Sequence, residues 1–266
     1  MNNQYLEIAR NIAVAAGTEL IHCRKNLAKL TITEKSENDF VSNVDQNIEH
    51  FIIEKIKYHF NHHAVLGEET SSQTALDSEY LWIIDPIDGT NNYLHGLPQY
   101  CISIALQIRN ELQLGVIYAP SMEQMYSAYK DQGAFLNNKA IFVSPRPTLA
   151  GALCAATIPP RSYKEKKLEK YCANLQTIRS SISGYRYSGS FAYDMAQVAM
   201  GVLDACWSPY SQPWDIAAGI CIIRAAGGQV VDFQGGTQLA PHQSVLAGNQ
   251  QLVAELQSLI NNDHDG

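Results

Sequence analysis

The sequence lacks the features of several well-known protein classes. Its six cysteines lie far apart and none belongs to a Cys-x-x-Cys pair, so neither a zinc site nor a disulfide framework is indicated, and buried free thiols are expected. No stretch reaches the roughly 18 uninterrupted apolar residues that a membrane helix requires. Glu7, Arg10 and Glu19 interrupt the apolar residues of the N-terminus, so a signal peptide is not expected. We therefore predict a cytoplasmic protein that does not enter a membrane.

Positive charge is also scarce. The 19 Lys and Arg residues stand against 26 Asp and Glu, which gives a formal net charge of -7, and the basic residues are scattered. Direct nucleic-acid binding is not expected, because it requires a stripe of basic residues that neutralises phosphates. An acidic protein can still bind a small anion through cations that it holds.

Two phosphate-handling motifs are missing as well. The pattern GxxxxGK[ST] does not occur, which argues against a nucleoside triphosphatase. No cysteine is followed by arginine six positions later, so the Cys-x5-Arg loop of a thiol-dependent phosphatase is absent. Any phosphate chemistry must therefore use other groups.

What the chain does contain is an alternation of helical and extended patterns. Helices are predicted over residues 3–28, 44–60, 164–177, 190–202 and 216–226. Strands are predicted over residues 81–84, 101–109, 113–118, 125–128, 134–136, 205–207 and 230–231, with Asn110-Glu111 as a hairpin turn. This interleaving predicts a mixed α and β protein. We expect a single domain, residues 1–266, built from two packed halves that divide near residue 145.

The segment Asp85-Pro86-Ile87-Asp88-Gly89-Thr90 directly follows a predicted buried strand. Its two carboxylates are three residues apart, on a turn that Pro86 restricts and Gly89 opens, so they can converge on one point. Hard cations such as Mg²⁺ prefer oxygen ligands of this kind. A polar turn without a metal is the alternative, since Asp, Pro and Gly all favour turns. The segment alone leaves both interpretations open.

Other polar residues are weaker indicators. Gly67-Glu68-Glu69-Thr70 is a second acidic loop, which could be no more than solvated. Asp215 stands where an ordinary helix cap would stand. His62-His63 suggests a metal pair, but adjacent side chains point apart, so we expect a solvated loop. Tyr185-Arg186-Tyr187 could stack on a nucleotide, although ordinary packing with an exposed Arg186 is expected instead.

Taken together, these segments resemble the inositol monophosphatase family. The matching segments are residues 82–93 for the first signature of the family, 214–219 with 226–228 for the second, 67–69 for an upstream acidic loop, and Lys35 and Asp45 for an early lysine and aspartate. The resemblance extends from about residue 5 to residue 258.

This resemblance implies a fold and a metal site. The fold would be an α/β (α+β) layered sandwich, αβαβα, like that of inositol monophosphatases and fructose-1,6-bisphosphatase, in a protein that forms homodimers. Two to three Mg²⁺ ions would bind, and lithium would inhibit. Glu68, Asp85 and the backbone carbonyl of Ile87 would hold the first ion. Asp85, Asp88 and Asp215 would hold the second, and Glu68 would help to hold a third.

The resemblance also implies roles around the substrate. Thr90, oriented by Asp45, would help to position and deprotonate the attacking water, so Glu68, Asp88, Thr90 and Asp45 are the expected catalytic residues. The backbone N–H groups of Gly89 and Thr90 would bind the phosphate, as expected where a turn leads into a helix. The remaining expected substrate contacts are Gly189, Ser190, Phe191, Ser208 and Asp215.

Two positions depart from the family pattern on the side of the alcohol leaving group. Ser208 stands where many members have an acidic residue that contacts substrate hydroxyls, and a neutral hydroxyl lacks the strength of a charge-assisted bond. Phe191 replaces a small residue. Either the protein recognises an alcohol other than inositol, or both changes are neutral variation in a permissive pocket.

We accordingly predict a Mg²⁺-dependent phosphomonoesterase that acts on a small soluble ester, inositol 1-phosphate or a related sugar-alcohol phosphate, by attack of a metal-activated water. Alternatives within this class are a 3′-phosphonucleotide phosphatase, a fructose-1,6-bisphosphatase and a histidinol-phosphate phosphatase. The alternative of another class is a regulatory scaffold that acts through a protein partner. The intact acidic residues favour an enzyme.

Overall fold

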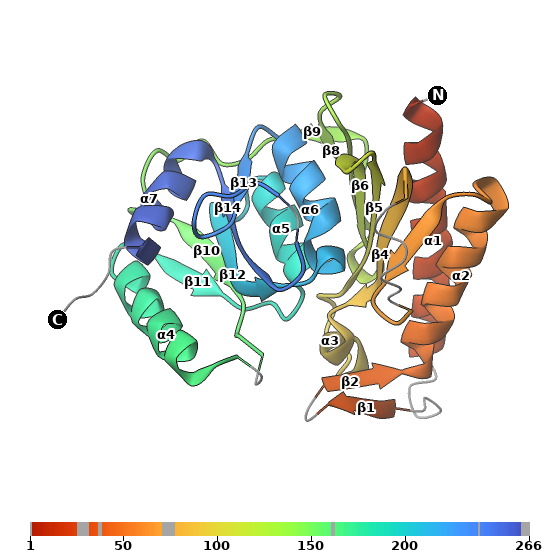
Figure 1. Ribbon diagram of the computed structural model, residues 1–266, viewed down its shortest axis with the longest axis horizontal. Coiled ribbons are helices and arrows are strands. Elements are labelled where there is room, and N and C mark those ends of the chain that lie inside the picture. Colours follow the sequence, from red (N-terminus) through yellow and green to blue (C-terminus); the bar gives the residue numbers. More distant parts are fainter. Residues whose placement is uncertain are drawn as a thin grey trace.

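Two large β-sheets and three layers of helices are stacked in alternation, and β1 and β2 form a separate two-stranded sheet (Figure 1). The computed structural model describes residues 2–25, 32–36, 39–70, 78–160, 163–238 and 240–261. Along the stack, the layers are α1 with α2, a seven-stranded sheet, α5 with α6, a five-stranded sheet, and α4 with α7. This is the αβαβα sandwich that the sequence predicted.

The helices are α1 (Asn2–Arg24), α2 (Asn43–His59), α3 (Thr90–Leu94), α4 (Glu165–Arg179), α5 (Phe191–Ala199), α6 (Pro213–Ala225) and α7 (Gln250–Asn261), with a 3₁₀ turn η3 (Pro120–Met122). The strands are β1 (Ile32–Ser36), β2 (Asp39–Ser42), β3 (Ala64–Gly67), β4 (Tyr80–Asp88), β5 (Cys101–Ile108), β6 (Glu111–Ala119), β7 (Gln124–Tyr129), β8 (Ala134–Leu136), β9 (Lys139–Ile141), β10 (Leu153–Ala156), β11 (Gly184–Arg186), β12 (Ala205–Ser211), β13 (Gln229–Val231) and β14 (Gln243–Gly248).

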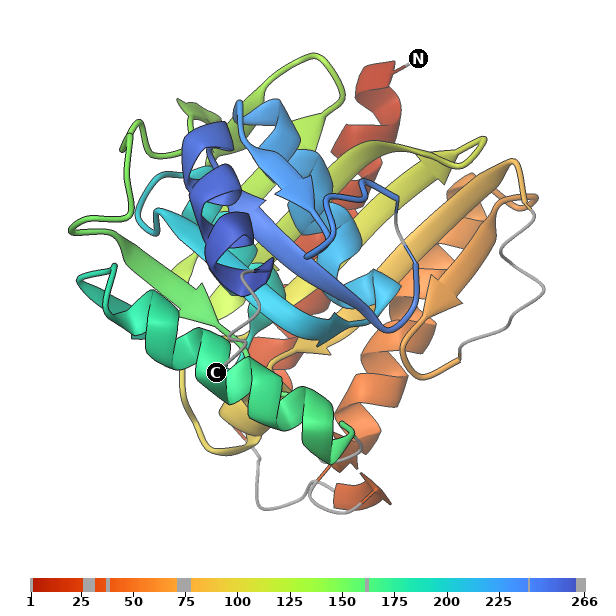
Figure 2. The same ribbon diagram turned by 60° about the vertical axis from the view of Figure 1, so that its left-hand side comes forward.

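The two sheets come from different parts of the chain. The larger has the order β3-β4-β5-β6-β7-β8-β9, in which only β3 and β4 are parallel. The smaller has the order β11-β10-β12-β14-β13, and α4 and α7 cover its outer face (Figure 2). The chain passes from the first sheet to the second between Ile141 and Leu153.

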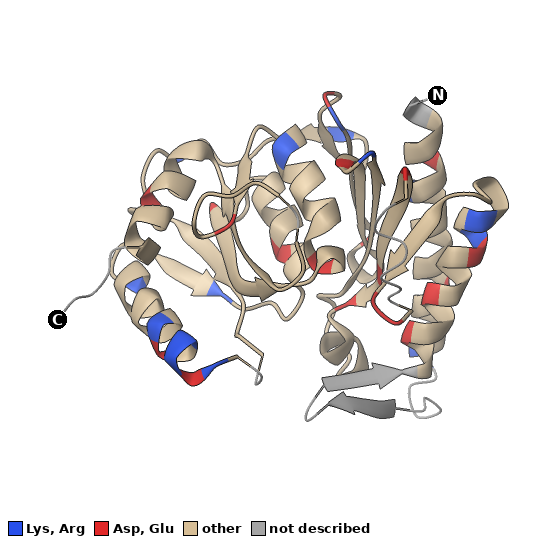
Figure 3. Ribbon diagram, in the orientation of Figure 1, with Lys and Arg blue, Asp and Glu red and all other residues tan. Residues whose placement is uncertain are grey.

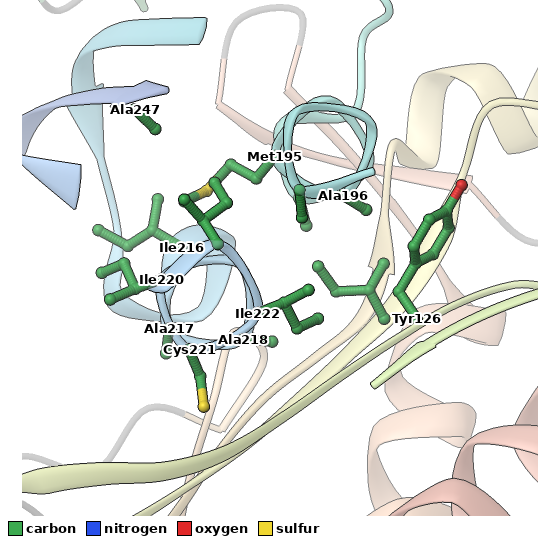
Figure 4. Close-up of a cluster of buried hydrophobic side chains, with 14 of the residues drawn as sticks. Tyr126, Met195, Ala196, Ile216, Ala217, Ala218, Ile220, Cys221, Ile222 and Ala247 are labelled. Atoms are coloured by element: carbon green, nitrogen blue, oxygen red, sulfur yellow. The ribbon is translucent and has the colours of Figure 1, made fainter. Parts of the chain in front are cut away.

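Helix α6 is buried along most of its length. Ile216, Ala217, Ala218, Gly219, Ile220, Cys221, Ile222 and Ile223 are all buried. A helix that is apolar all round belongs inside a protein, and α6 packs beside α5 between the two sheets (Figure 4). By contrast, α2 buries one stripe, with Val44, Ile48, Ile52 and Ile56 four residues apart. These opposite patterns place α6 in the central layer and α2 on the outside.

Several local predictions differ from the structure. The hairpin after β5 turns at Arg109 and Asn110, one residue earlier than predicted, and both residues have positive φ (51° and 63°), as a two-residue turn matched to strand twist requires. Strand β4 continues to Asp88 through an irregular register instead of ending before Asp85. Four cysteines are buried as expected, but Cys172 is exposed and Cys23 is partly so.

The prediction of a solvated loop at His62-His63 is wrong for His63. Its ring stacks between Phe60 and Tyr80, with centroid distances of 4.8 and 4.4 Å. The indole N–H of Trp82 donates to His63 Nδ1 at 3.0 Å, so Nδ1 must be unprotonated. Burial, together with the positive charge of nearby Lys57, lowers the pKa of His63 below its ordinary value of 6.5. This stack therefore holds a neutral histidine beside the start of β3.

We predict that His63 makes folding sensitive to mild acid. The unfolded chain protonates this histidine near pH 6.5, whereas the folded chain resists protonation, so this contribution to stability is fully present above that pH and is lost as the pH falls below it. His63→Phe keeps the stack and should flatten the fall in the free energy of unfolding between pH 7 and pH 5, measured by urea denaturation. The same change at exposed His59 should leave the pH dependence as in the parent protein. Equal pH dependence in all three proteins would contradict the prediction.

Candidate active site

Two parallel strands bring acidic residues to one end of the seven-stranded sheet. Gly67 of β3 lies opposite Ile84 of β4, so the next residues, Glu68 and Asp85, come at the same level of the sheet. Asp85 is 2% exposed, and its Oδ1 accepts the backbone N–H of Ile87 at 2.9 Å. This short-range bond turns the chain within β4 and separates Asp85 from Asp88.

Gly89 allows the chain to turn from β4 into the short helix α3. Its φ of 97° lies in the left-handed region that glycine favours, and an added Cβ would lie 3.0 Å from the carbonyl oxygen of Gln99. Thr90 begins α3, and its hydroxyl donates to Asp45 Oδ1 at 2.9 Å and also lies 3.1 Å from the carbonyl oxygen of Ile87. The structure thus joins Thr90 to buried Asp45, the residue that the sequence predicted as its partner.

The other two aspartates are held at helix N-termini. Asp88 Oδ2 accepts the Ser190 hydroxyl at 2.8 Å and the Ala192 backbone N–H at 2.6 Å, at the beginning of α5. Asp215, in the first turn of α6, accepts the Gln212 backbone N–H at 2.8 Å as part of a capping box. The positive end of a helix dipole stabilises a carboxylate at each place. Figure 3 shows acidic residues at the corresponding ends of α5 and α6.

Burial and mutual repulsion dominate the electrostatics of these acids. Burial raises the pKa of Asp85 well above its ordinary value, and the charges of Glu68, Asp88 and Asp215 raise it further. Burial and the charges of Asp88 and Glu68 likewise raise the pKa of Asp215. For Asp88, burial raises the pKa to about 6, although its bonds to α5 act in the opposite direction. The site therefore brings the charges of several acids close together.

The donor set fits a hard divalent cation. Carboxylate oxygens are the ligands that Mg²⁺ prefers, and a cation would offset the repulsion that raises these pKa values. The bonds described above engage Oδ1 of Asp85 and Oδ2 of Asp88 and Asp215, so the second oxygen of each is the one available to a metal. As the described side chains stand, no three His, Cys, Asp or Glu residues are grouped tightly enough to hold an ion. Ligation would therefore draw these carboxylates together.

Glu49 supports the acidic loop, and the sequence did not reveal it. Glu49 is fully buried on α2, and its Oε2 accepts the backbone N–H of Glu69 at 2.9 Å. Its carboxylate lies over Gly67, where an added Cβ would come within 2.5 Å of it. The spacing of four residues from Asp45 on the same helix was the available signal, because it places both acids on one face. Glu49 therefore helps to fix the position of Glu68.

A cavity of about 180 Å³ opens beside the aspartates. It is lined by Asp88, Thr157, Ile158, Tyr187, Gly189, Ser190, Phe191, Asp194, Ser208, Tyr210, Ser211 and Asp215. The structure thus gathers at one cavity the predicted substrate contacts at 189–191, 208 and 215, with Gly89 close by, since an added Cβ on Gly89 would lie 3.1 Å from Ser190 Cβ. Glu68, Asp85, Ile87 and Asp45 are not among the residues that line it. The side chain of Lys35 lies outside the described residues.

The two departures from the family pattern occupy different environments. The Phe191 side chain is 7% exposed and packs in the core between the sheets, so its bulk is directed mainly away from the cavity. Ser208 is 1% exposed on β12 and lines the cavity. Asp194, which the sequence did not single out, also lines it. Burial raises the pKa of Asp194 to about 7, and hydrogen bonds from Ser188 oppose this shift.

Comparison with known proteins assigns the family. The model of the inositol monophosphatase family matches residues 1–263. The chain belongs to the inositol monophosphatase family. It is 35% identical over 245 residues to the Nus factor SuhB of Vibrio cholerae and 34% identical over 245 residues to the inositol-1-monophosphatase of Mesorhizobium japonicum. Each alignment covers 92% of this chain and 91% of the relative.

A solved member of the family supports the fold directly. The extragenic suppressor protein suhB of Bartonella henselae superposes with a TM-score of 0.92 at 31% identity, covering 98% of this chain and 99% of that one. In the part of our chain that the structure describes, no helix is both long and apolar enough to span a membrane. The inositol monophosphatase family thus includes relatives named for an enzymatic activity and relatives named as Nus factors.

We predict that the acidic site reduces the stability of the metal-free protein. Asp88→Asn keeps an acceptor for α5 and removes a buried charge, so it should raise the free energy of unfolding by about 1–3 kcal/mol at pH 7.5 in the presence of a chelator. Urea denaturation measures this change. With Mg²⁺ added, the parent protein should gain more stability than the variant.

Asp204→Asn is the matched control. Asp204 is also buried, but Arg146 Nε lies 3.1 Å from its Oδ1 and the Leu153 N–H donates to its Oδ2 at 2.8 Å. Removing this paired charge should lower stability by about 1–3 kcal/mol, with or without Mg²⁺. If both variants lost stability equally in chelator, the acids of the site would not be repelling one another.

Proposed function

We propose that this protein is a Mg²⁺-dependent phosphomonoesterase. The observation that carries the proposal is the group formed by Glu68, Asp85, Asp88 and Asp215 beside a small open cavity, in which the charges of neighbouring acids raise the pKa values of Asp85 and Asp215. Such a group suits hard cations, and the cations can in turn bind a phosphate. Without cations, the buried carboxylates lower the stability of the fold. Membership of the inositol monophosphatase family supports the same activity.

The proposed roles follow from the side chains. Bound Mg²⁺ ions, two or three per site, would neutralise the phosphate and lower the pKa of the attacking water. Glu68, Asp85, Asp88, Asp215 and the carbonyl of Ile87 would hold them. The Thr90 hydroxyl donates a hydrogen bond to Asp45, so the lone pairs of its oxygen can accept a hydrogen bond from the water. Asp45 would then help to hold the proton that the water releases.

The backbone at the start of α3 would bind the phosphate. Gly89 turns the chain so that the first N–H groups of α3 lack helical partners, and such groups bind anions. On the other side, residues 189–191 and 215 would face the alcohol, in a cavity whose wall also includes Ser208. Inositol 1-phosphate or a related sugar-alcohol phosphate is the proposed substrate, with a 3′-phosphonucleotide, fructose 1,6-bisphosphate and histidinol phosphate as alternatives. We also propose that the protein is cytoplasmic and forms a homodimer.

The relatives named Nus factor SuhB favour a second candidate function. A Nus factor works with other macromolecules, so this chain could act as a scaffold that binds a protein partner. A strain whose only copy of the gene encodes the Asp88→Asn variant distinguishes the two candidate functions. A phenotype like that of the deletion would support the enzyme, whereas a normal phenotype together with a catalytically dead variant would support the scaffold.

We predict that phosphate release from a panel of esters requires Mg²⁺. The panel includes inositol 1-phosphate, a 3′-phosphonucleotide, fructose 1,6-bisphosphate and histidinol phosphate. A chelator should reduce release to background, because the phosphate would then meet unneutralised carboxylates. Lithium in the millimolar range should inhibit by occupying a Mg²⁺ position. Phosphate release that persists without divalent metal would contradict the proposal.

We also predict that the contact between Thr90 and Asp45 acts on the chemical step. Thr90→Ala should lower kcat by about 10²–10⁴-fold with a smaller effect on KM, because the water loses its acceptor. Steady-state kinetics on the best ester of the panel gives both constants. Thr18→Ala is the control, since the exposed Thr18 hydroxyl bonds only within α1, and it should behave as the parent protein. A Thr90→Ala enzyme with unchanged kcat would rule out this role.

A further inference from the structure

The Ser208 hydroxyl has no hydrogen-bonding capacity left for a substrate. It accepts the Thr157 hydroxyl at 2.8 Å, donates to the carbonyl oxygen of Tyr210 at 2.7 Å and lies 3.3 Å from the Tyr210 N–H. A serine hydroxyl has one donor and two acceptor lone pairs, and these contacts engage all three. The residue that the family resemblance assigns to the alcohol is therefore engaged within the protein itself.

Ser211 is in the opposite condition. It is 1% exposed and lines the same cavity, but its Oγ has no hydrogen-bond partner. Among the described side chains that line this cavity, it is the buried one whose polar atom is unpartnered. A buried hydroxyl without a partner carries a free-energy cost, which a polar group inside the cavity would remove.

An irregularity in β12 explains why both serines reach one cavity. Side chains three residues apart in a regular strand point to opposite faces of the sheet. Here Ser208 pairs with Val245 and Ser211 pairs with Gln243, so β12 has one more residue than β14 between the two pairs. This bulge shifts the alternation by one position and turns Ser211 toward the side of Ser208. A bulge next to a cavity is a common means of redirecting a side chain.

Two exposed side chains with large carbon surfaces, Ile158 and Tyr187, also line the cavity. Ile158 follows β10 and Tyr187 follows the parallel neighbour β11, and these side chains are 67% and 55% exposed. The prediction of ordinary packing is thus wrong for Tyr187, which lines the cavity together with Ile158. Asp194 is already bonded by Ser188. The cavity therefore offers one unpartnered hydroxyl at its floor and apolar side chains at its rim.

We propose that Ser211, and not Ser208, is the side chain that hydrogen-bonds to the alcohol half of the substrate. This inference rests on the proposed phosphatase function. It assigns the substrate to phosphate esters whose alcohol carries a further hydroxyl beside the ester oxygen and an apolar body beyond it. The Ser211 hydroxyl bonds to that hydroxyl, while Ile158 and Tyr187 cover the apolar body.

Two esters that differ by one hydroxyl test the assignment. They are the monophosphate of trans-cyclohexane-1,2-diol and cyclohexyl phosphate, which share the same ring. With Mg²⁺ present, the parent enzyme should have a kcat/KM about tenfold higher for the diol ester, the factor that one hydrogen bond typically supplies. Ser211→Ala should bring this ratio to about one by lowering only the value for the diol ester. Ser211→Thr, which retains a hydroxyl, should keep most of the ratio.

Ser208→Ala is the matched control, because it removes the other serine hydroxyl of the same strand. It should keep the tenfold ratio, and its melting temperature should fall, since the Thr157 hydroxyl and the Tyr210 backbone lose their partner. Ser211→Ala should melt no lower than the parent, because its hydroxyl has no partner to lose. These melting temperatures also report whether each variant is folded.

The outcomes separate this inference from the proposed function. If no ester of any kind released phosphate with Mg²⁺, the proposed function itself would fail. If the enzyme were active on other esters but had a ratio of one, or turned over neither ring ester, the assignment of Ser211 and of the apolar rim would be wrong. If Ser208→Ala abolished the ratio of the two kcat/KM values and Ser211→Ala kept it, Ser208 and not Ser211 would be the side chain that contacts the alcohol.

Discussion

The repulsion among buried carboxylates is the constraint to which much of the described structure responds. Asp85, Asp88 and Asp215 lie in a region where burial alone raises their pKa values, and the charge of Asp88 raises the pKa values of the other two further. The fold limits this cost by placing backbone N–H groups against them. Asp88 lies at the N-terminus of α5 and Asp215 in the first turn of α6, where the helix dipoles favour negative charge. The three acids are thus held apart and partly compensated.

This requirement explains the central layer of the sandwich. Helices α5 and α6 must begin at the acids and then run between two sheets, so most of their remaining side chains are buried. Gly219 of α6 and Met195 of α5 are in such close contact that an added Cβ would lie 2.6 Å from the Met195 sulfur. Such packing is rigid, because protein interiors are filled to nearly crystalline density. The apolar helices thereby hold the N–H groups that stabilise the charges.

Features that depend on local chemistry could be predicted from the sequence. The apolar run of α6, the amphipathic stripe of α2 and the turn at Asp85–Thr90 all follow from short-range pattern, and the motif resemblance supplied the order of layers. The rest depends on contacts between distant segments. The stacking of His63 needs Tyr80, Glu49 matters because Gly67 comes beneath it, and the bulge in β12 is defined only by its register with β14. No spacing within a single segment encodes these contacts.

The register of β12 with β14 changes the interpretation of Ser208, the position that departs from the family pattern. From sequence, replacing an acid by serine suggested a weaker version of the same contact. In the structure, the Ser208 hydroxyl bonds to Thr157 and Tyr210, and the bulge turns the next serine into the cavity. A carboxylate at 208 could not donate a hydrogen bond to the carbonyl oxygen of Tyr210, as the Ser208 hydroxyl does across the bulge, so substrate preference depends on the shape of β12 as well as on one side chain. The phosphate side has no such freedom, because its acids are tied to α5 and α6. The two halves of the site can therefore change independently.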